Sequence, residues 1–357
     1  MSKKYYELGE YPRILIESKL RPVQGDRFQP ASFSNLGNSV YERPDGKEMV
    51  LVDTAQSVAN MLESTIISDD GVNVKKELDG ISYVLSELEL NHKDGRSPLK
   101  TSTSSLIEPH RINSPYIMFD HPEFQSKLVE RADYSKGTLI NWKKIGETLF
   151  YFDINSLLHG TFLSNLKDGG RFRVPRIVSG FIEAENAKRV LSGGVKNSSL
   201  NDPRGEVVVE DHETGKVYTT GGHETPNVYT NVPYTRTEFT AESISGYFNI
   251  DLSLIYGYGM DRAASNLLIS LALYKIVTLL KNGLRPRTAC DLMVEKTIVT
   301  YPDEFNLPSQ KELLEEVRNN IAECRKKGLF PEPPVTVVKT KVQVKQKTAD
   351  TGDDGTE

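Results

Sequence analysis

RILIESKLRPVQGDRFQP, residues 13–30, begins with an alternating segment and ends in a loop rich in arginine and glutamine. Ile14, Ile16 and Ser18 alternate with residues 15, 17 and 19, and this two-residue period is typical of a half-buried strand. Pro22 and Gly25 interrupt the pattern, because proline cannot donate a ladder hydrogen bond and glycine favours turns. The segment therefore predicts a strand over 13–20 that leads into a polar loop.

Helical and strand patterns occupy much of the remaining chain. Four apolar side chains share one face of a predicted helix over 55–67, with Asp53 or Thr54 as its N-cap. A closing helix over 309–327 begins with a capping box formed by Ser309 and Glu312. The other predicted elements are strands at 49–52, 81–90, 148–153, 171–185 and 293–300, a short helix at 155–163, a hairpin over 206–219 and a long helix over 263–282.

The order of the major elements is strand, helix, strand, a long insertion with further strands, helix and strand. This order predicts an α+β fold of the ferredoxin-like class. We expect a single domain over 1–330, with insertions at about 68–80, 91–147 and 186–246. From residue 331 the chain is rich in Pro, Lys and Asp without periodicity, which predicts a disordered tail over 331–357.

Composition indicates a globular protein with a substantial core. The chain has 357 residues, of which 38% are hydrophobic and 26% charged. Its formal net charge is -5, but arginine is dense in 13–27, 171–176 and 285–287. A basic groove on an acidic protein therefore remains compatible with the sequence. The two cysteines cannot form a disulfide framework and no leader precedes Glu10, so we expect a reducing cytoplasm.

The most apolar stretch is residues 267–280. Ser270, Lys275 and Thr278 interrupt it, and it falls short of the ~20 apolar residues that a bilayer requires. The sequence therefore predicts a buried helix here and no membrane span.

Motifs of the common catalytic and cofactor sites are absent from the sequence. There is no Cys-x-x-Cys zinc spacing, no GxxxxGK[ST] phosphate loop and no GxSxG nucleophile elbow. We expect no cofactor, no structural metal and no catalytic residue. The sharpest enzyme candidate is Asp26 beside Arg27, since a loop aspartate near a phosphate can hold a metal ion in RNA cleavage. The sequence favours the alternative, in which Asp26 fixes a turn or pairs with an arginine.

Three clusters have the composition of a nucleic-acid interface. The first contains Arg21, Gln24, Arg27 and Phe28, which combine forked phosphate donors, an amide and a ring that can stack on a base. Arg111 lies in a second cluster with short polar side chains at 102–114. The third, RFRVPR at 171–176, places Arg171 and Arg173 on one face of a strand. An ordinary loop, a capped turn and a solvated strand face are the competing interpretations of the three.

Five ordered blocks of the sequence together resemble one known family. They are RILIESKLRPVQGDRFQP, LVDTAQSVANMLES, TSSLIEPHRINSPYI, INSLLHGTFL and RFRVPRIVSGFIEAENA, within residues 13–300. The chain resembles the CRISPR-associated RAMP-superfamily proteins, the seven-group Cas subunits, that form the repeated backbone of the type I-G (formerly I-U) Cascade complex.

This resemblance implies a modified RRM-like palm with a thumb-like β-rich insertion. It implies several copies stacked head to tail on one CRISPR RNA, which pairs with a target DNA strand, and partnership with a large Cascade subunit and a Cas5–Cas6-type subunit. It implies no catalysis by this subunit. By matching blocks, backbone binding is carried over to Arg21, Gln24, Arg27, Arg111, Arg171 and Arg173, and an RNA-proximal position to Phe28.

Three functions follow as hypotheses. The first is the non-catalytic guide-RNA backbone subunit. The second is a RAMP-type, metal-dependent endoribonuclease that uses Asp26, although no acidic or histidine partner stands near Asp26 in the sequence. The third is a purely structural subunit whose long loops contact other proteins.

Overall fold

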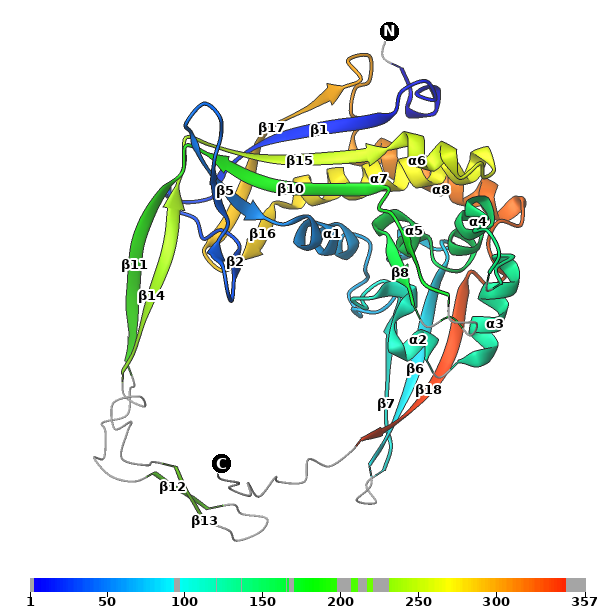
Figure 1. Cartoon of the computed structure of the whole chain (residues 1–357), viewed down its shortest axis with the longest axis horizontal. Coiled ribbons are helices and arrows are strands. Elements are labelled where there is room, and N and C mark those ends of the chain that lie inside the picture. Colours follow the sequence, from blue (N-terminus) through cyan, green and yellow to red (C-terminus); the bar gives the residue numbers. More distant parts are fainter. Residues whose placement is uncertain are drawn as a thin grey trace.

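The computed structural model describes residues 3–92, 97–119, 121–135, 137–164, 166, 170–197, 207–210, 217–220 and 231–344 (Figure 1). Its centre is a seven-stranded antiparallel sheet with the spatial order β16-β17-β1-β15-β10-β5-β4. The strands are β1 (Arg13–Pro22), β4 (Val40–Glu42), β5 (Glu48–Asp53), β10 (Val178–Glu185), β15 (Ser243–Asp251), β16 (Leu284–Arg287) and β17 (Cys290–Tyr301).

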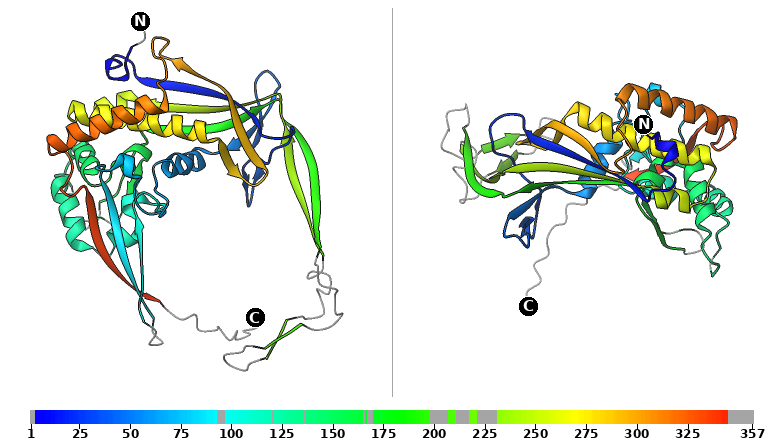
Figure 2. Two further views of the ribbon diagram at one scale, coloured as in Figure 1. Left: turned by 180° about the vertical axis from the view of Figure 1, so that it is seen from behind. Right: turned by 90° about the horizontal axis from the view of Figure 1, so that it is seen from above.

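Two helices connect the central strands of this sheet. α1 (Ala55–Ser64) lies between β1 and β10 in the chain, and α7 (Arg262–Asn282) lies between β15 and β17. In space the four strands have the order β17-β1-β15-β10. α7 and the closing helix α8 (Gln310–Lys326) run beneath the sheet (Figure 2), and α1 contacts both β10 and α7. The fold is therefore α+β, as predicted, with a curled antiparallel sheet.

The two-residue period of β1 determines which of its side chains enter the core. Ile14, Ile16 and Leu20 are buried, whereas Lys19 on the opposite face is exposed. On that opposite face the rings of Phe181 and Tyr247 lie 5.1 Å apart between centroids. The sheet therefore has one face covered by helices and one face that carries an aromatic pair.

Helix α7 crosses the core. By length and composition it is the one helix among the described residues that could span a membrane, but 89% of its most apolar window is buried inside the protein. Asp261 caps its N-terminus by accepting a hydrogen bond from the Ala263 N–H, and Gly283 ends it with φ 79°. The prediction of a buried helix is confirmed.

Two arms descend from opposite ends of the central sheet (Figure 1). One is a long ribbon of β11 (Lys188–Asn197) and β14 (Asn231–Thr240). The other contains a three-stranded sheet with the order β18-β6-β7, formed by β6 (Tyr83–His92), β7 (Leu99–Ser104) and β18 (Val335–Val344). Helices of this second arm are α2 (Pro115–Met118), α3 (Pro122–Arg131), α4 (Trp142–Phe152) and α5 (Ile154–His159).

The remaining elements are short. The strand pairs are β2 (Ser32–Phe33) with β3 (Gly37–Asn38), β8 (Thr161–Leu163) with β9 (Phe172–Val174), and β12 (Val207–Glu210) with β13 (Val217–Thr220). Helix α6 (Leu252–Gly257) follows β15, and 3₁₀ turns lie at Tyr5–Glu7, Lys76–Leu78 and Arg111–Asn113.

Most element predictions are confirmed. β1, α1, β6, α5, α7, β17 and α8 match the predicted types, and both hydrogen bonds of the Ser309–Glu312 capping box are present. Thr54 is the N-cap of α1. The predicted hairpin over 206–219 is formed by β12 and β13, and the turn between them lies outside the described residues.

The strand predicted at 148–153 is wrong. Residues 142–152 form α4, whose N-cap Asn141 accepts a hydrogen bond from the Lys144 N–H. Ile145, Leu149 and Phe152 are buried at helical spacing. A short apolar run does not distinguish a buried strand from a buried helix. Here the run is the end of a helix that begins at Trp142.

The predicted disordered tail over 331–357 is also wrong in its first part. β18 pairs with β6 in parallel register from Val335 to Val344. Val338 and Thr340 are buried, whereas Lys339 on the other face is exposed and its ammonium lies 3.6 Å from Glu87. The alternating Val, Thr and Lys residues therefore form a strand pattern, and the lysines gave the segment the composition of a disordered tail. Residues 345–357 lie outside the described residues.

Candidate nucleic-acid interface

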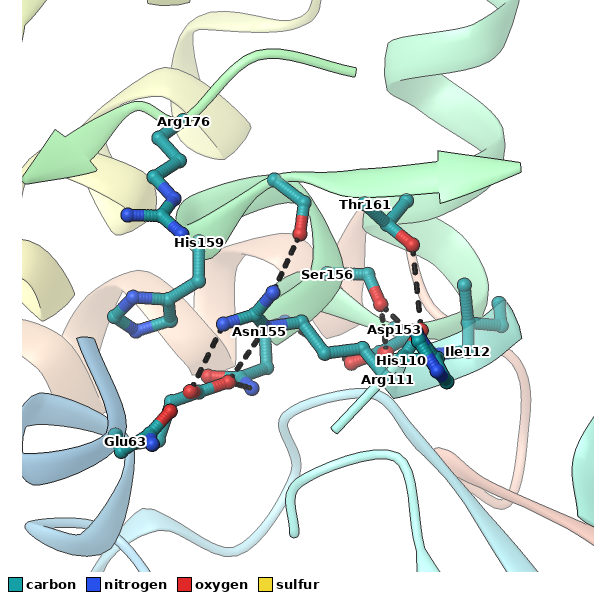
Figure 3. Close-up of polar contacts among 12 residues, drawn as sticks. Glu63, His110, Arg111, Ile112, Asp153, Asn155, Ser156, His159, Thr161 and Arg176 are labelled. Carbon is teal, nitrogen blue, oxygen red and sulfur yellow. Dashed lines mark hydrogen bonds and ion pairs between the residues drawn. The ribbon is translucent and has the colours of Figure 1, made fainter. Parts of the chain in front are cut away.

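A buried ion pair joins α1 to the 3₁₀ turn Arg111–Asn113 (Figure 3). Arg111 Nε donates to Glu63 Oε1 at 2.7 Å and Arg111 Nη2 donates to Glu63 Oε2 at 3.0 Å. Both residues are less than 10% exposed. The third guanidinium nitrogen, Nη1, donates to the Gly160 carbonyl at 2.9 Å. Arg111 is thus held in one orientation by a forked carboxylate contact and a backbone oxygen.

The pair continues into a chain of hydrogen bonds across α5 and α7. Asn155 Nδ2 donates to Glu63 Oε1 at 2.7 Å, and Lys275 Nζ donates to Asn155 Oδ1 at 2.6 Å. Lys275 Nζ also lies 2.9 Å from His159 Nε2. Burial lowers the pKa of Lys275 to about 7, because the charged form is poorly solvated there.

His159 is fully buried, and burial lowers the pKa of its ring well below the usual value. The positive charges of Lys275, Arg111 and Arg176 lower it further. The ring is therefore neutral at pH 7. Its Nδ1 has no hydrogen-bond partner among the described residues.

Asp153 fixes the start of α5 against the same turn. Its carboxylate accepts hydrogen bonds from the Asn155 N–H, at 3.1 Å, and from the Ser156 hydroxyl. Ser156 Oγ in turn accepts from the Ile112 N–H at 3.1 Å. Burial raises the pKa of Asp153. This contact holds α5, and hence His159, in a fixed position relative to Arg111.

A cleft of about 560 Å³ opens beside this network; we call it the arginine cleft. Arg176 donates to the Ala55 carbonyl at 3.1 Å and to the Gln56 side chain, both neutral oxygens. Among the described residues, three arginines and no carboxylate line the cleft. The full lining is Pro109, His110, Arg111, His159, Gly160, Thr161, Phe162, Arg173, Val174, Pro175, Arg176 and Ser179.

Glycine is required at position 160, where α5 turns into β8. The backbone φ is +75°, in the region that disfavours residues with a Cβ. A Cβ at this position would lie 2.8 Å from the Val174 carbonyl oxygen. The turn therefore brings β8 and β9 close to the Arg111 guanidinium.

The loop after β1 forms a second cleft of about 490 Å³, which we call the loop cleft. Gln24 and Arg27 line it, and Arg27 Nη1 lies 3.2 Å from Glu238 Oε2 on β14. Arg21 pairs with Glu295 on β17 at 3.3 Å. Both arginines remain more than half exposed, so water screens these pairs and a phosphate can compete for them.

The prediction that Phe28 is available to a base is wrong. Phe28 is 1% exposed and packs in the core. Its backbone exchanges two hydrogen bonds of 2.9 Å with Phe239, which tie the loop to the root of β14. The ring is part of the hydrophobic core, as expected if this segment is an ordinary loop.

The predicted site residues fall into two places. Arg21, Gln24 and Arg27 surround the loop after β1, whereas Arg111 and Arg173 line the arginine cleft. Arg111 is buried and bound to Glu63, so it does not offer a free guanidinium. Arg171 is exposed and lines neither cleft. RNA contact by these residues stays a prediction.

Three residues of the arginine cleft were not predicted as site residues from the sequence: His159, Phe162 and Arg176. Arg176 was detectable as the third arginine of RFRVPR. His159 and Phe162 carry no local signal, because their positions depend on the turn at Gly160 and on the pairing of β8 with β9.

No group of three or more His, Cys, Asp or Glu side chains that could hold a metal ion occurs within the described residues. Asp26 lies in the loop cleft with Glu238 and Asp291, but Arg27 stands among them and pairs with Glu238.

Comparison with protein families gives a match over residues 14–189. These residues match the family described as CRISPR-associated protein GSU0053. Over residues 14–189 the chain is similar to a CRISPR-associated family. This confirms the family-level resemblance, while subtype I-G stays a prediction. The matched segment contains β1, the loop after it and all three arginines of the arginine cleft.

Solved structures give weaker similarities. A chain of a "CRISPR RNA-guided surveillance complex, pre-nicking" is 12% identical with a TM-score of 0.36, over 88% of this chain and 89% of that one. The crystal structure of Thermofilum pendens Csc2 is 14% identical with a TM-score of 0.30, over 92% of this chain and 81% of that one. Among curated proteins, no sequence matches.

Proposed function

We propose that the protein is a non-catalytic, CRISPR RNA-binding backbone subunit of a type I Cascade surveillance complex, of subtype I-G. The observation that carries the proposal is the match of residues 14–189 to a CRISPR-associated family. That segment supplies Arg21, Arg27 and the arginine cleft. Guanidinium groups bind phosphate oxygens with forked hydrogen bonds, and a repeated phosphate backbone is the ligand that such groups suit.

The fold supports a specific division of labour within the proposed subunit. The order β1, α1, β10, β15, α7, β17 along the chain, with β17-β1-β15-β10 in space, supports a ferredoxin-like, RRM-like palm. The β11–β14 ribbon is the proposed thumb. Copies stack head to tail along one guide RNA, which pairs with target DNA. The proposed protein partners are the large Cascade subunit and the Cas5–Cas6-type subunit.

Co-expression with a CRISPR RNA and the partner subunits tests this proposal. We expect several copies of the chain to co-purify on RNA at low salt, with retention falling steeply between about 50 and 200 mM salt. The readouts are the ratio of absorbance at nucleic-acid and protein wavelengths and the mass of the particle. A monomer that carries no RNA under these conditions would overturn the proposal. Assembly with partner proteins but without RNA would favour the purely structural role.

A further inference from the structure

The arginine cleft has an excess of positive charge that no described protein group balances. Arg111 is neutralised by Glu63, but Arg176 donates only to neutral oxygens and Arg173 pairs with no carboxylate among the described residues. The described lining of the cleft contains no acidic residue. Two guanidinium charges at a concave site, partly shielded from water, are complementary to an anionic ligand.

His159 supplies a further donor whose direction is fixed by the protein. When Lys275 is protonated it has only N–H groups to offer, so in that state His159 Nε2 accepts from Lys275. A neutral imidazole carries one proton, which this contact places on Nδ1. That N–H is fully buried, has no partner among the described residues and stands on the side of the ring that faces Arg176 (Figure 3). A buried N–H without a partner is costly unless a ligand or water accepts from it.

Phe162 adds an aromatic surface to the same side of the cleft. It is directly opposite Arg173 in the β8–β9 ladder, so the two side chains point to the same face. The ring is 50% exposed, unlike its buried neighbours Thr161 and Leu163. Nucleobases stack on exposed aromatic rings of this kind, beside positively charged groups that bind the phosphate.

We propose that the arginine cleft is a nucleotide subsite, in which Arg173, Arg176 and His159 Nδ1–H hold one phosphate group and Phe162 stacks on the attached base or a neighbouring one. This deepens the proposed function and rests on it for the source of the nucleotide, a single-stranded guide RNA. A volume of about 560 Å³ lies within the range of small-molecule sites and accommodates a nucleotide. Lys275 is a positioning residue, since it acts only through His159.

Equilibrium binding of fluorescent single-stranded RNA, about eight nucleotides long, to the full chain tests the subsite. Arg173→Gln should reduce the slope of log affinity against log salt by about 0.7, the value for one phosphate contact on a single strand. Arg325→Gln is the control, because Arg325 is exposed on α8 and does not line the cleft. Both substitutions are on the surface, so folding is not at issue.

Phe162→Ala should weaken binding by about 5- to 100-fold without changing the salt slope. Phe33→Ala is its control, since Phe33 is similarly exposed on β2. On an RNA that lacks all its bases, wild type and Phe162→Ala should bind equally. AMP and inorganic phosphate serve as competitors. Displacement of RNA by AMP at an affinity comparable to that of the strand would assign the site to free nucleotides.

Two failures are distinguishable. If wild type binds RNA, but Arg173→Gln behaves like Arg325→Gln and Phe162→Ala like Phe33→Ala, the subsite is wrong and the proposed function stands. If wild type binds no RNA at any salt, the proposed function fails. Binding of AMP that Arg173→Gln abolishes would then still support the subsite, and absence of AMP binding would overturn it.

Discussion

At the scale of single residues, the hydrogen bonds among the buried polar groups determine which groups of the site lack a partner. Glu63 accepts hydrogen bonds from Arg111 and Asn155, and the side-chain oxygen of Asn155 accepts one from Lys275. These groups are buried, so each depends on its neighbour for solvation. His159 ends this chain of hydrogen bonds, and its Nδ1 has no partner among the described residues. Arg173 and Arg176 lie outside the chain and line the cleft.

Removing the carboxylate charge of Glu63 tests this dependence. We expect Glu63→Gln to lower the free energy of unfolding by about 3 kcal/mol, because Arg111 would keep a buried charge without a counter-ion. Chemical denaturation measures the change. Glu332→Gln is the control: Glu332 also faces an arginine with both oxygens, at 3.0 and 3.1 Å, but the pair is exposed. Its loss should cost at most about 1 kcal/mol, and equal losses at the two sites would contradict the buried network.

Lys275 makes stability depend on pH. Its pKa of about 7 in the folded protein lies below the value of about 10.4 for an unfolded lysine. The unfolded chain therefore binds more protons between these values, and the free energy of unfolding should rise with pH above 7, by up to about 1.4 kcal/mol per pH unit. Denaturation between pH 7 and pH 9 measures the slope. Lys275→Met should flatten it, and an unchanged slope would show that another group is responsible.

The arginines of the candidate site were predictable as residue types, but their roles were not. Arg111 and Arg173 lie in the same cleft, yet one is bound to Glu63 and the other pairs with no carboxylate in the described part of the chain. Which arginine is neutralised depends on Glu63, 48 residues away in the chain. Phe28 and Phe162 show the same limit, since burial of one ring and exposure of the other are decided by tertiary contacts.

At the scale of elements, the turn from α5 into β8 controls the shape of the arginine cleft. We expect Gly160→Ala to destabilise the protein by about 2–4 kcal/mol, the sum of left-handed backbone strain and a contact with the Val174 carbonyl. Gly46→Ala is the matched control, because Gly46 has a φ of +80° and a Cβ added there would meet nothing within 4 Å. Its cost should be about 1–2 kcal/mol, from strain alone. Thermal denaturation of both variants separates the two contributions.

Elements with their own local signals were predictable from the sequence. The caps and apolar periodicity of α1 and α8, and the alternation in β1, lie within or next to single elements of 10 to 17 residues. α4 and β18 were not predictable, for opposite reasons. The apolar end of α4 lacks a distinguishing period by itself, and β18 carries lysines on its exposed face that resemble a solvated tail. Contacts with residues distant in the sequence determine the structure of both elements.

At the scale of the whole molecule, the loop cleft and the arginine cleft are lined by different residues. Double substitution of Arg21 and Arg27 by Gln should reduce RNA retention and lower the salt slope by about 1.4, for two phosphate contacts. Arg325→Gln is the control, an exposed arginine of α8 paired with Glu332. Co-purification with the guide RNA measures retention. Equal retention by the double variant and wild type would remove the loop after β1 from the RNA path.

The endoribonuclease hypothesis makes a separate prediction for the assembled particle. We expect bound target RNA to stay intact in the presence of divalent metal ions, for wild type and for Asp26→Ala alike. Gel analysis of labelled RNA measures this. Metal-dependent cutting at regular intervals by wild type, lost in Asp26→Ala, would establish the enzyme function instead.

Because β18 pairs with β6, the three-stranded sheet of the second arm cannot form completely until β18 has been synthesised. Ser86 and Thr340, joined by hydroxyls 3.0 Å apart, are separated by 254 residues. At the usual rate of translation, the ribosome needs on the order of 10–50 s to cover that distance. During this interval β6 has only β7 beside it, and a two-stranded hairpin is marginally stable alone. The sheet of the second arm is therefore completed after the last strand of the central sheet, β17, has been synthesised.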